Sequence, residues 1–234
     1  MSEKILIIGA GAAGLMAAGT ISGRGKDVTI LERNDKPARK VAITGKGRCN
    51  VTNNCRELSE LIANVPTNGR FLYSAFSNFM PQDTIELIED MGVPLKCERG
   101  NRVFPLSDKA SDVTKCLCAY AEEAGAEIKL NEKVLSINAS DGKIVSVVTD
   151  KATYPCDNAI VCTGGVSYPS TGSTGDGYAF AKSFGHTIIS PVAALSGVNL
   201  KGDFYKNLQG LSLKNVAISV VNGKKKIYSD FGEM

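Results

Sequence analysis

The sequence predicts an α/β fold with a parallel sheet, followed by the start of a second, mainly β domain. Two short apolar runs, residues 4–8 and 158–162, each lead into a glycine-rich turn, as is typical of strands that are buried on both faces and end in tight turns. From about residue 190 the pattern changes to short β segments with polar loops. We therefore expect one α/β domain over residues 1–189 and part of a β-rich domain over residues 190–234.

The chain opens with a βαβ unit of about 30 residues. Residues 4–8 are predicted to form a strand, residues 15–21 a helix packed closely on the sheet, and residues 27–32 a second strand that ends in an acid. Residues 33–55 are rich in glycine and basic side chains and are expected to form a loop too long for a mere connection. Further helices are expected at 56–64, 70–79, 81–91 and 108–123, with short strands at 95–97 and 102–104.

A β excursion separates these elements from the second glycine-rich strand end. Three segments alternate apolar and polar residues and are predicted as strands: 126–130, 133–139 and 143–149. Asp141-Gly142 is a typical hairpin turn between the last two. Residues 158–162 predict a buried parallel strand, and a helix is expected from Asp176 or Gly177 to Phe184. Beyond it, short strands are expected at 187–190, 216–221 and 225–228.

Composition and charge exclude several classes of protein. The 234 residues carry 27 basic and 24 acidic side chains, a net charge of +3, so no global field calls for nucleic acid or an acidic membrane as a partner. A single histidine, His186, rules out zinc sites built from several histidines, and no metal site is expected. Seven cysteines without a CxxC spacing fit a reducing, cytoplasmic location. Residues 5–23 are uncharged, but their five glycines and their strand-turn-helix pattern argue against a membrane span.

The glycines after the first strand have the spacing of a dinucleotide-binding turn. Gly9-x-Gly11-x-x-Gly14 puts glycine where the strand turns, where a pyrophosphate must touch backbone, and where helix and strand pack closely. Glu32, at the end of the second strand, is placed to accept hydrogen bonds from ribose hydroxyls and to repel a 2′-phosphate, which disfavours NADP at this site. The plain alternative is a structural turn beside a solvated Glu32. Contacts to the dinucleotide are expected at Gly9, Gly11, Ala12, Ala13, Gly14, Glu32 and Arg33.

A second glycine pair favours FAD over NAD. A simple NAD dehydrogenase needs neither Thr163-Gly164-Gly165 at the end of a later strand nor the β excursion that precedes it. With both features, the sequence resembles the two-motif FAD proteins of the glutathione-reductase-like superfamily, which have a Rossmann-type FAD-binding domain. The resemblance implies that Thr163, Gly164 and Gly165 border the FAD and that Val134 contacts the adenine through its backbone.

Three further segments narrow the resemblance. They are GKGRCNVTN at residues 45–53, RVFP at 102–105 and SYPSTGSTGDGY at 167–178. In combination they are similar to the signatures of the BaiN/RdsA-type FAD-dependent oxidoreductases, which are also described as aminoacetone-oxidase-like flavoproteins. Membership implies a noncovalent FAD, a mainly β domain inserted into the Rossmann-type domain, and a C-terminal stretch that returns to the flavin. The sequence ends at Met234 without such a stretch, so we expect a chain truncated within the inserted domain.

The loop around residue 48 is the main candidate for contacts to the flavin ring. Gly45 and Gly47 allow close approach of the backbone and positive φ angles, while Arg48 offers a planar fork of donors. Cys49 and Asn50 are placed to hydrogen-bond the ribityl chain or the isoalloxazine. Arg48 and Cys49 are the candidate catalytic residues, Arg48 for stabilising negative charge on the reduced flavin and Cys49 as a thiol beside it.

Several roles stay open. A basic surface loop is the alternative for residues 45–50 and the favoured interpretation for residues 36–40. Cys49 is either a thiol beside the flavin or a packed core thiol. A redox pair with Cys55 is disfavoured, because the C-x5-C spacing would turn the two side chains apart. Asp176 is either an N-cap of its helix, which is the favoured interpretation, or a contact of the cofactor's polar chain.

Together these features predict a flavin-dependent oxidoreductase. FAD is expected to receive electrons from a small organic substrate or from NAD(P)H, a candidate electron donor, and the acceptor is O2 or an unsaturated carbonyl compound. The expected partner is a small-molecule substrate; the oligomeric state is left open. Two alternatives remain: a flavin-dependent RNA-modifying protein, in which the basic stretch 33–48 meets phosphates, and a nonenzymatic dinucleotide-binding module.

Overall fold

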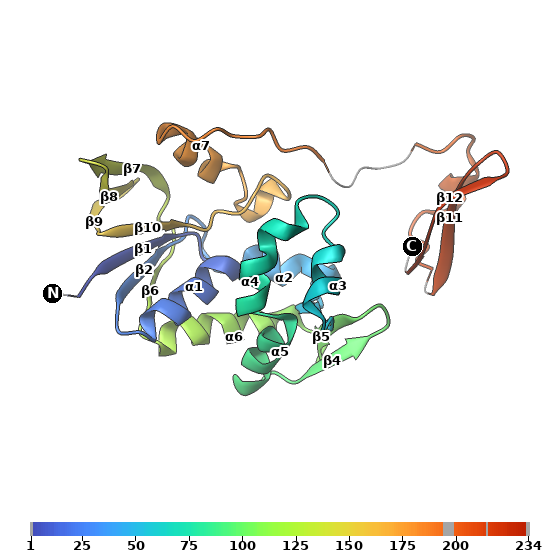
Figure 1. Ribbon diagram of the computed structural model, residues 1–234, viewed down its shortest axis with the longest axis horizontal. Coiled ribbons are helices and arrows are strands. Elements are labelled where there is room, and N and C mark those ends of the chain that lie inside the picture. The colour runs from blue at the N-terminus through green and yellow to red at the C-terminus, as the bar shows by residue number, and fades with distance from the viewer. Residues whose placement is uncertain (1, 194–198, 214, 233–234) are drawn as a thin grey trace. The chain divides into compact units, whose positions relative to one another are not determined.

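The computed structural model describes residues 2–193, 199–213 and 215–232, which divide between two compact units, Met1–Ile189 and Ser190–Met234 (Figure 1). The first unit is built on a four-stranded sheet with the order β10-β1-β2-β6. Its strands are β1 (Lys4–Ile8), β2 (Asp27–Leu31), β6 (Glu127–Lys129) and β10 (Asn158–Val161), and all pairings are parallel. Ile8 pairs with both Leu31 and Val161, so three carboxyl ends lie level at one edge of the sheet. The predicted α/β fold is confirmed.

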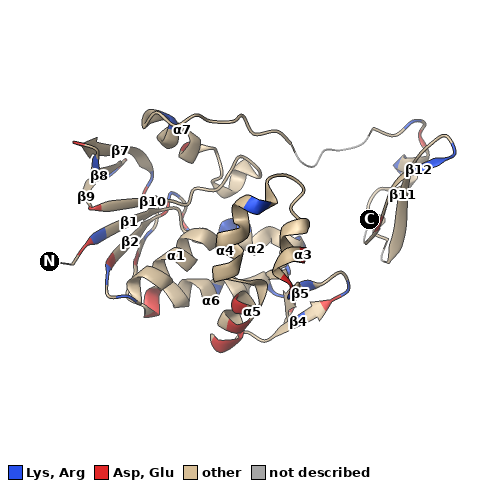
Figure 2. Cartoon of the chain, viewed as in Figure 1, with Lys and Arg blue, Asp and Glu red and all other residues tan. Residues whose placement is uncertain are grey.

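Two helices cover one face of this sheet. They are α1 (Ala12–Ser22) and α6 (Ala110–Glu123), and their buried residues form a common core with Ile5 and Ile7 of β1. The two helices touch at Gly19, where an added Cβ would overlap the ring of Tyr120. Figure 2 shows α1 without a charged residue, which agrees with its packing on the sheet and on α6.

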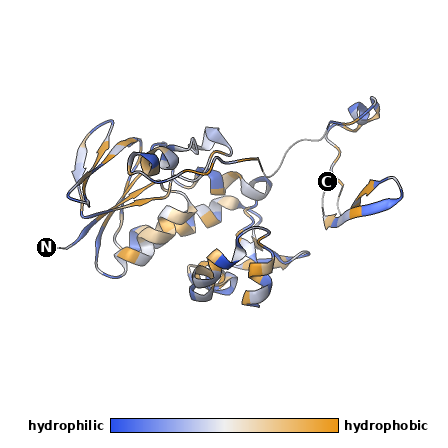
Figure 3. Cartoon of the chain, turned by 45° about the horizontal axis from the view of Figure 1, so that its top comes forward, coloured by the Kyte–Doolittle hydropathy of each residue, from blue (hydrophilic) through white to orange (hydrophobic). Residues whose placement is uncertain are grey.

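A small antiparallel sheet and a helix bring apolar residues to the other face. The sheet has the order β7-β8-β9, and its buried residues cluster with Leu6 and Ile8 of β1 and with Phe180 of the helix. The bounds are β7 (Val134–Ser140), β8 (Lys143–Thr149), β9 (Thr153–Pro155) and α7 (Asp176–Ser183). Figure 3 shows the hydrophobic residues in the central strands and in the helices packed on them. Successive residues of β1 thus enter two different cores, which explains its unbroken apolar run.

A third group of elements lies between β2 and α6 in the sequence. An antiparallel sheet of order β3-β5-β4 consists of β3 (Thr52–Asn53), β4 (Leu95–Glu98) and β5 (Arg102–Pro105). Its helices are α3 (Leu58–Ala63), the 3-10 turn η2 (Gly69–Leu72), α4 (Tyr73–Asn78) and α5 (Pro81–Asp90). The amide of Val51 donates to the carbonyl of Val103 at 2.8 Å, so this sheet holds the end of the loop that contains residues 45–50.

Three local predictions were wrong. Residues 33–55 are not one loop, since they contain α2 (Arg39–Ile43), the 3-10 turn η1 (Thr44–Gly47) and β3. Residues 126–130, predicted as the first strand of the β excursion, contain β6, which pairs with β2 and so belongs to the parallel sheet. The third strand of the antiparallel sheet is β9, which pairs with β8. Residues 187–190 form no strand, because no described strand pairs with them.

The second unit contains a 3-10 turn and one hairpin. The turn is η4 (Phe204–Leu208), and β11 (Val216–Asn222) pairs antiparallel with β12 (Lys225–Gly232). Among the described residues, no helix has the length and apolarity needed to cross a membrane. All seven cysteines are free thiols, and the described part of the chain holds no metal-binding cluster of His, Cys, Asp or Glu.

Candidate functional site

A cavity of about 720 Å³ opens at the carboxyl ends of β1, β2 and β10. Its volume lies within the range of about 300–1,000 Å³ that is usual for ligand pockets. Both glycine-rich strand ends border it, as expected for a ligand crevice in an open parallel sheet. Twelve of the predicted site residues line it: Gly9, Gly11, Ala12, Ala13, Glu32, Arg33, Cys49, Asn50, Val134, Thr163, Gly164 and Asp176.

The first wall is the turn from β1 into α1, and each of its glycines has a separate geometric reason. Gly9 has φ +105°, and its amide donates to the carbonyl of Leu31 at 2.9 Å. A Cβ at Gly14 would overlap the carbonyl oxygen of Gly9, so only glycine lets α1 pack this closely on the turn. A Cβ at Gly11 would meet no atom within 4 Å, although Gly11 borders the cavity. The space beside Gly11 is therefore open to a ligand.

The N-terminus of α1 faces this space, and no side chain of the protein caps its free amides. No side chain caps the helix at Gly11, and the first turn contains no acidic residue. The amides of a first helical turn have no acceptor within the helix, and they carry the positive end of its dipole. Together with the open side of Gly11, these amides fit the pyrophosphate of a dinucleotide.

The second wall is the loop after β10, and it lies directly against the first. The amide of Cys162 donates to the carbonyl of Ile8 at 2.8 Å, and a Cβ at Gly9 would stand 2.7 Å from the carbonyl oxygen of Cys162. The hydroxyl of Thr163 accepts the amide of Gly177 at 3.1 Å, which ties the start of α7 to this wall. The two glycine motifs thus meet although about 150 residues separate them in the chain.

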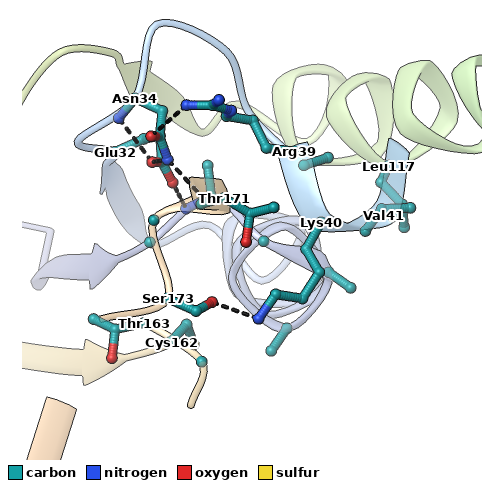
Figure 4. Close-up of a pocket in the computed structure, with 18 of the residues that line it drawn as sticks. Glu32, Asn34, Arg39, Lys40, Val41, Leu117, Cys162, Thr163, Thr171 and Ser173 are labelled. Carbon is teal, nitrogen blue, oxygen red and sulfur yellow. Dashed lines mark hydrogen bonds between the residues drawn. The ribbon is translucent and has the colours of Figure 1, made fainter. Parts of the chain in front are cut away.

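Glu32 lies at the bottom of the crevice, at 7% exposure. Its Oε2 accepts the amide of Ala10 at 2.8 Å, while its Oε1 accepts the amide and the side-chain nitrogen of Asn34 at 2.9 and 2.6 Å (Figure 4). A carboxylate oxygen accepts two hydrogen bonds, so Oε2 keeps capacity for one further donor. The side chain is therefore fixed by the protein and fits a ribose hydroxyl.

Arg33, which follows β2, and Asp176, the first residue of α7, form an ion pair on the border of the cavity. Arg33 Nη1 donates to Asp176 Oδ2 at 2.9 Å and to the hydroxyl of Thr174 at 2.7 Å. The favoured N-cap role of Asp176 was wrong: the N-cap of α7 is Gly175, in the left-handed region at φ +87°, and no side chain caps the helix. Asp176 is the first helical residue, and its carboxylate instead holds Arg33.

The basic residues at the start of α2 also line the cavity. Arg39 Nη1 donates to Asn34 Oδ1 at 2.9 Å, and Lys40 Nζ donates to Ser173 Oγ at 2.6 Å (Figure 4). The solvated interpretation of residues 36–40 was therefore wrong for Lys40, which is half-buried, whereas Arg39 borders the cavity but is exposed. The sequence contains no signal for their direction, because it depends on Ala38, which lies in the left-handed region at φ 54° and donates its amide to Ala10.

Three residues of the segment 44–50 line the cavity: Thr44, Cys49 and Asn50. Gly45, Lys46, Gly47 and Cys49 all have positive φ, between 58° and 83°. At Gly45 an added Cβ would stand 2.9 Å from the amide nitrogen of Asn50, so the loop folds back closely on itself. This tight path puts Cys49 and Asn50 on the cavity wall. Gly45 and Gly47 shape the path without lining the cavity.

Arg48 points away from the cavity. Its guanidinium stacks 4.2 Å above the ring of Phe104 and hydrogen-bonds the carboxylates of Glu98 and Asp108. These bonds raise the pKa of Arg48 and hold the pKa of Glu98 below its ordinary value; the pKa of Asp108 is lowered by Lys96 as well as by Arg48. The structure therefore gives Arg48 the position of an anchor between the loop and the sheet β3-β5-β4.

Replacing Arg48 by methionine is expected to loosen this anchor. Methionine keeps the apolar contact with Phe104 but removes the hydrogen bonds to Glu98 and Asp108, which keep the weaker charge balance of Lys96, so the melting temperature should fall by about 2–4 °C. Lys26→Met removes a comparable exposed ion pair with Glu3, distant in sequence from the loop, and should change the melting temperature less. Calorimetry of both variants makes the comparison. Equal melting temperatures for Arg48→Met and the wild type would contradict the anchor.

Cys49 is a neutral thiol at physiological pH. It is 3% exposed, and burial raises the pKa of its thiol from 9.0 to about 11. Because the unfolded thiol ionises first, this contribution to stability is complete below about pH 9 and is lost as the pH rises toward 11. Cys55, the other member of the disfavoured redox pair, is also buried but does not line the cavity.

Alkylation rates can test this state of Cys49. At pH 8 its thiolate fraction should be about 100-fold lower than that of an ordinary thiol, since each pKa unit changes the fraction tenfold. Peptide mapping after iodoacetamide treatment should find the exposed Cys97 modified first and Cys49 protected. Preferential modification of Cys49 would mean that its thiol is activated.

Sequence reasoning missed two residues of the cavity lining, the acidic Glu132 and the polar Asn34. Glu132 is buried on the cavity wall, where it accepts the hydroxyls of Thr149 at 2.6 Å and Tyr154 at 3.1 Å; these bonds lower the pKa of Glu132. Asn34 links Glu32 to Arg39 and donates to the carbonyl of Thr171 at 3.2 Å. The sequence signal that points to each residue is its distance from a predicted site residue: Asn34 lies two residues after Glu32, and Glu132 lies two residues before Val134. Five of the predicted site residues do not line the cavity: Gly14, Gly45, Gly47, Arg48 and Gly165.

Comparison with known proteins agrees with this geometry. A family model described as "HI0933-like protein Rossmann domain" matches residues 3–227. The ribosomal RNA dihydrouridine synthase of Haemophilus influenzae is 34% identical over 229 residues, which are 95% of this chain and 55% of that protein. The 3-dehydro-bile acid delta(4,6)-reductase of Clostridium scindens is 30% identical over 234 residues, or 99% of this chain and 56% of that protein. The chain spans about half the length of the curated relatives it matches.

Solved structures show the same fold at lower identity. A flavocytochrome c3 fumarate reductase in its open conformation has a TM-score of 0.58 and 21% identity, covering 78% of this chain and 40% of its own. A 3-ketosteroid-delta4-(5alpha)-dehydrogenase from Rhodococcus jostii RHA1 has a TM-score of 0.52 and 16% identity, covering 71% and 47%. The glycine motifs, the cavity and the match over residues 3–227 agree, and the chain belongs to the HI0933-like family of FAD-dependent Rossmann-fold proteins.

Proposed function

We propose that this chain is the FAD-binding part of a reductase that uses NAD(P)H to saturate a carbon-carbon double bond conjugated with a carbonyl group. In the overall reaction one hydride from the nicotinamide and one proton from water add across the double bond, giving NAD(P)+ and the saturated product. FAD is bound noncovalently, the substrate is a small molecule, and the seven free thiols favour a reducing cytoplasm.

One observation carries the cofactor part of the proposal: the open space beside Gly11, under the uncapped N-terminus of α1 and next to the fixed carboxylate of Glu32. A pyrophosphate needs the free amides of a helix N-terminus, and the neighbouring ribose needs an acceptor for its hydroxyls, such as this carboxylate. When bound, FAD supplies the hydride transfer chemistry. The amides of Ala12 and Ala13 bind the pyrophosphate, Glu32 binds the ribose hydroxyls, and Val134 borders the adenine. Cys49 and Asn50 remain for the flavin ring.

The names of two relatives support the acceptor part. One makes dihydrouridine, in which a double bond beside a carbonyl has been saturated, and the other is a reductase of a dehydro-bile acid. Those substrates belong to those proteins. Their common chemistry is the addition of two hydrogens to an unsaturated carbonyl compound, and this is the class of acceptor that we assign to the present chain.

The cofactor can be identified with the purified protein. We expect a yellow protein that releases FAD, rather than FMN, on denaturation, and whose flavin absorption is bleached anaerobically by NADH or NADPH. Addition of an unsaturated ketone should restore the colour, and mass spectrometry should find a product heavier by two hydrogens. Gly11→Ala is the matched control: its Cβ enters the cavity without touching the protein, so this variant should fold as the wild type does and bind FAD less tightly. A colourless protein that binds only nicotinamide would overturn the proposal.

A second candidate function is the reduction of uridine in ribosomal RNA. It is favoured by two relatives with this name, at 34% identity in Haemophilus influenzae and 30% in Escherichia coli. Incubation of the reduced protein with ribosomal RNA should then produce dihydrouridine, and RNA binding should weaken steeply with salt. Reduction of a small unsaturated ketone, without RNA binding at low salt, would exclude this candidate.

A further inference from the structure

Lys40 extends from α2 to the opposite wall of the cavity. Its Nζ donates to Ser173 Oγ at 2.6 Å (Figure 4). It also donates to the carbonyl oxygen of Ser167 at 2.8 Å, and both acceptors belong to the loop after β10. An ammonium group has three donors, and these two bonds use two of them. One donor of this half-buried group therefore remains for a ligand in the cavity, whose lining includes Lys40.

In the described part of the chain, the charge of Lys40 has no counter-ion. Within residues 2–193 and the other described segments, no carboxylate lies in ion-pair distance of Lys40, whereas the neighbouring cation Arg33 pairs with Asp176 at 2.9 Å. Ser173 and Ser167 offer only neutral oxygens. A cation held by neutral acceptors on the wall of a cavity favours an anionic ligand there.

The position of Lys40 is tied to both glycine walls. Two residues before it, the amide of Ala38 donates to the carbonyl of Ala10 within the first glycine turn, at 2.8 Å. At the other end, Ser173 Oγ stands 3.0 Å from the place of a Cβ on Gly164, in the second glycine loop. The backbone before Lys40 is therefore bonded to the first loop and its ammonium to the second, and the N-terminus of α1 opens into the same cavity.

We propose that Lys40 is a phosphate-binding residue of this site, whose ammonium pairs with the pyrophosphate of the bound dinucleotide. The inference rests on the proposed binding of FAD. Amides of α1 bind the phosphates from the first wall, and Lys40 supplies a full positive charge from the second. This charge also offsets the fixed carboxylates of Glu32 and Glu132, which line the same cavity and would repel a pyrophosphate.

The test compares ligands with and without phosphate. In the wild type, ADP should displace FAD more effectively than adenosine does. Lys40→Gln keeps a donor for Ser173 but removes the charge, and should weaken FAD binding and reduce the advantage of ADP over adenosine, each by about tenfold. Lys40→Met should do the same, and Lys40→Arg should restore most of the affinity. Lys36→Met is the matched control, since Lys36 belongs to the same basic segment and does not line the cavity.

The outcomes separate this inference from the proposed function. A wild-type protein that binds neither FAD nor ADP overturns the proposed function. A wild-type protein that binds FAD, with Lys40→Gln retaining both the affinity and the ADP-to-adenosine ratio, overturns the role of Lys40 alone. If Lys40→Met is poorly folded in a thermal melt, the comparison of Lys40→Gln with Lys40→Arg decides, because both keep a hydrogen-bond donor and only one keeps the charge.

Discussion

Gly14→Ala is expected to lower the free energy of unfolding by about 3 kcal/mol, at the upper end of the usual cost of overpacking. The added Cβ overlaps the carbonyl oxygen of Gly9, which is backbone and cannot rotate away. Nor can the turn move as a whole, because the Gly9 amide is bonded to Leu31 and the carbonyl of Cys162 lies against its α-carbon. Urea denaturation followed by circular dichroism measures the loss.

Gly11→Ala is the control that separates folding from binding. Its Cβ meets no protein atom within 4 Å, so the urea midpoint should stay close to that of the wild type. The same methyl group occupies the space in which a pyrophosphate would approach the backbone, so FAD affinity should fall by about tenfold or more. A Gly14→Ala variant with a wild-type midpoint would show that α1 can shift outward, contrary to the packing described above.

Glu32→Gln is expected to damage both the ligand site and the turn that supports it. The two carboxylate oxygens accept three N–H groups, from Ala10 and from the backbone and side chain of Asn34. In glutamine one of these oxygens becomes a donor that faces other donors, which should cost about 1–3 kcal/mol of stability in this buried position. FAD affinity should fall by about 10- to 100-fold, because a ribose hydroxyl also loses a charged acceptor.

Titration of the apoprotein with FAD, together with urea denaturation, measures both effects. Glu132→Gln serves as the comparison, since Glu132 also lines the cavity but takes its two close hydrogen bonds from the hydroxyls of Thr149 and Tyr154. Both hydroxyls donate to the same oxygen, Oε1, so glutamine can keep an acceptor there and place its amide nitrogen at the position of Oε2, and this variant should lose less stability. If Glu32→Gln binds FAD as the wild type does, Glu32 has a purely structural role.

The parts of the fold that repeat a local pattern could be predicted from the sequence. The apolar runs and glycine spacings at residues 4–14 and 158–165 correspond to β1, β10 and the two walls of the cavity. Glu32 was predicted from its place after β2. These predictions succeed because a strand that turns tightly into a loop or helix leaves its requirements in adjacent residues.

The rest of the site depends on contacts between distant residues. Arg48 is an anchor because Glu98 and Asp108 lie 50 and 60 residues further along the chain, and no local pattern reports this. The alternating pattern of β6 resembles that of the following antiparallel strands, and its pairing with β2 in the parallel sheet depends on tertiary contacts. Lys40 resembles any lysine of a basic loop until the left-handed residue Ala38 turns α2 toward the cavity.

The position of β1 between β2 and β10 has a consequence for biosynthesis. Ile5 pairs with Asn158, so a ribosome makes one strand 153 residues before the partner on its other side. At synthesis rates of about 5–20 residues per second, β1 waits roughly 8–30 s with one edge unpaired. The binding crevice shares this delay, because its second wall follows β10. The nascent chain therefore cannot capture its cofactor early, and loading must come after nearly the whole first unit has been translated.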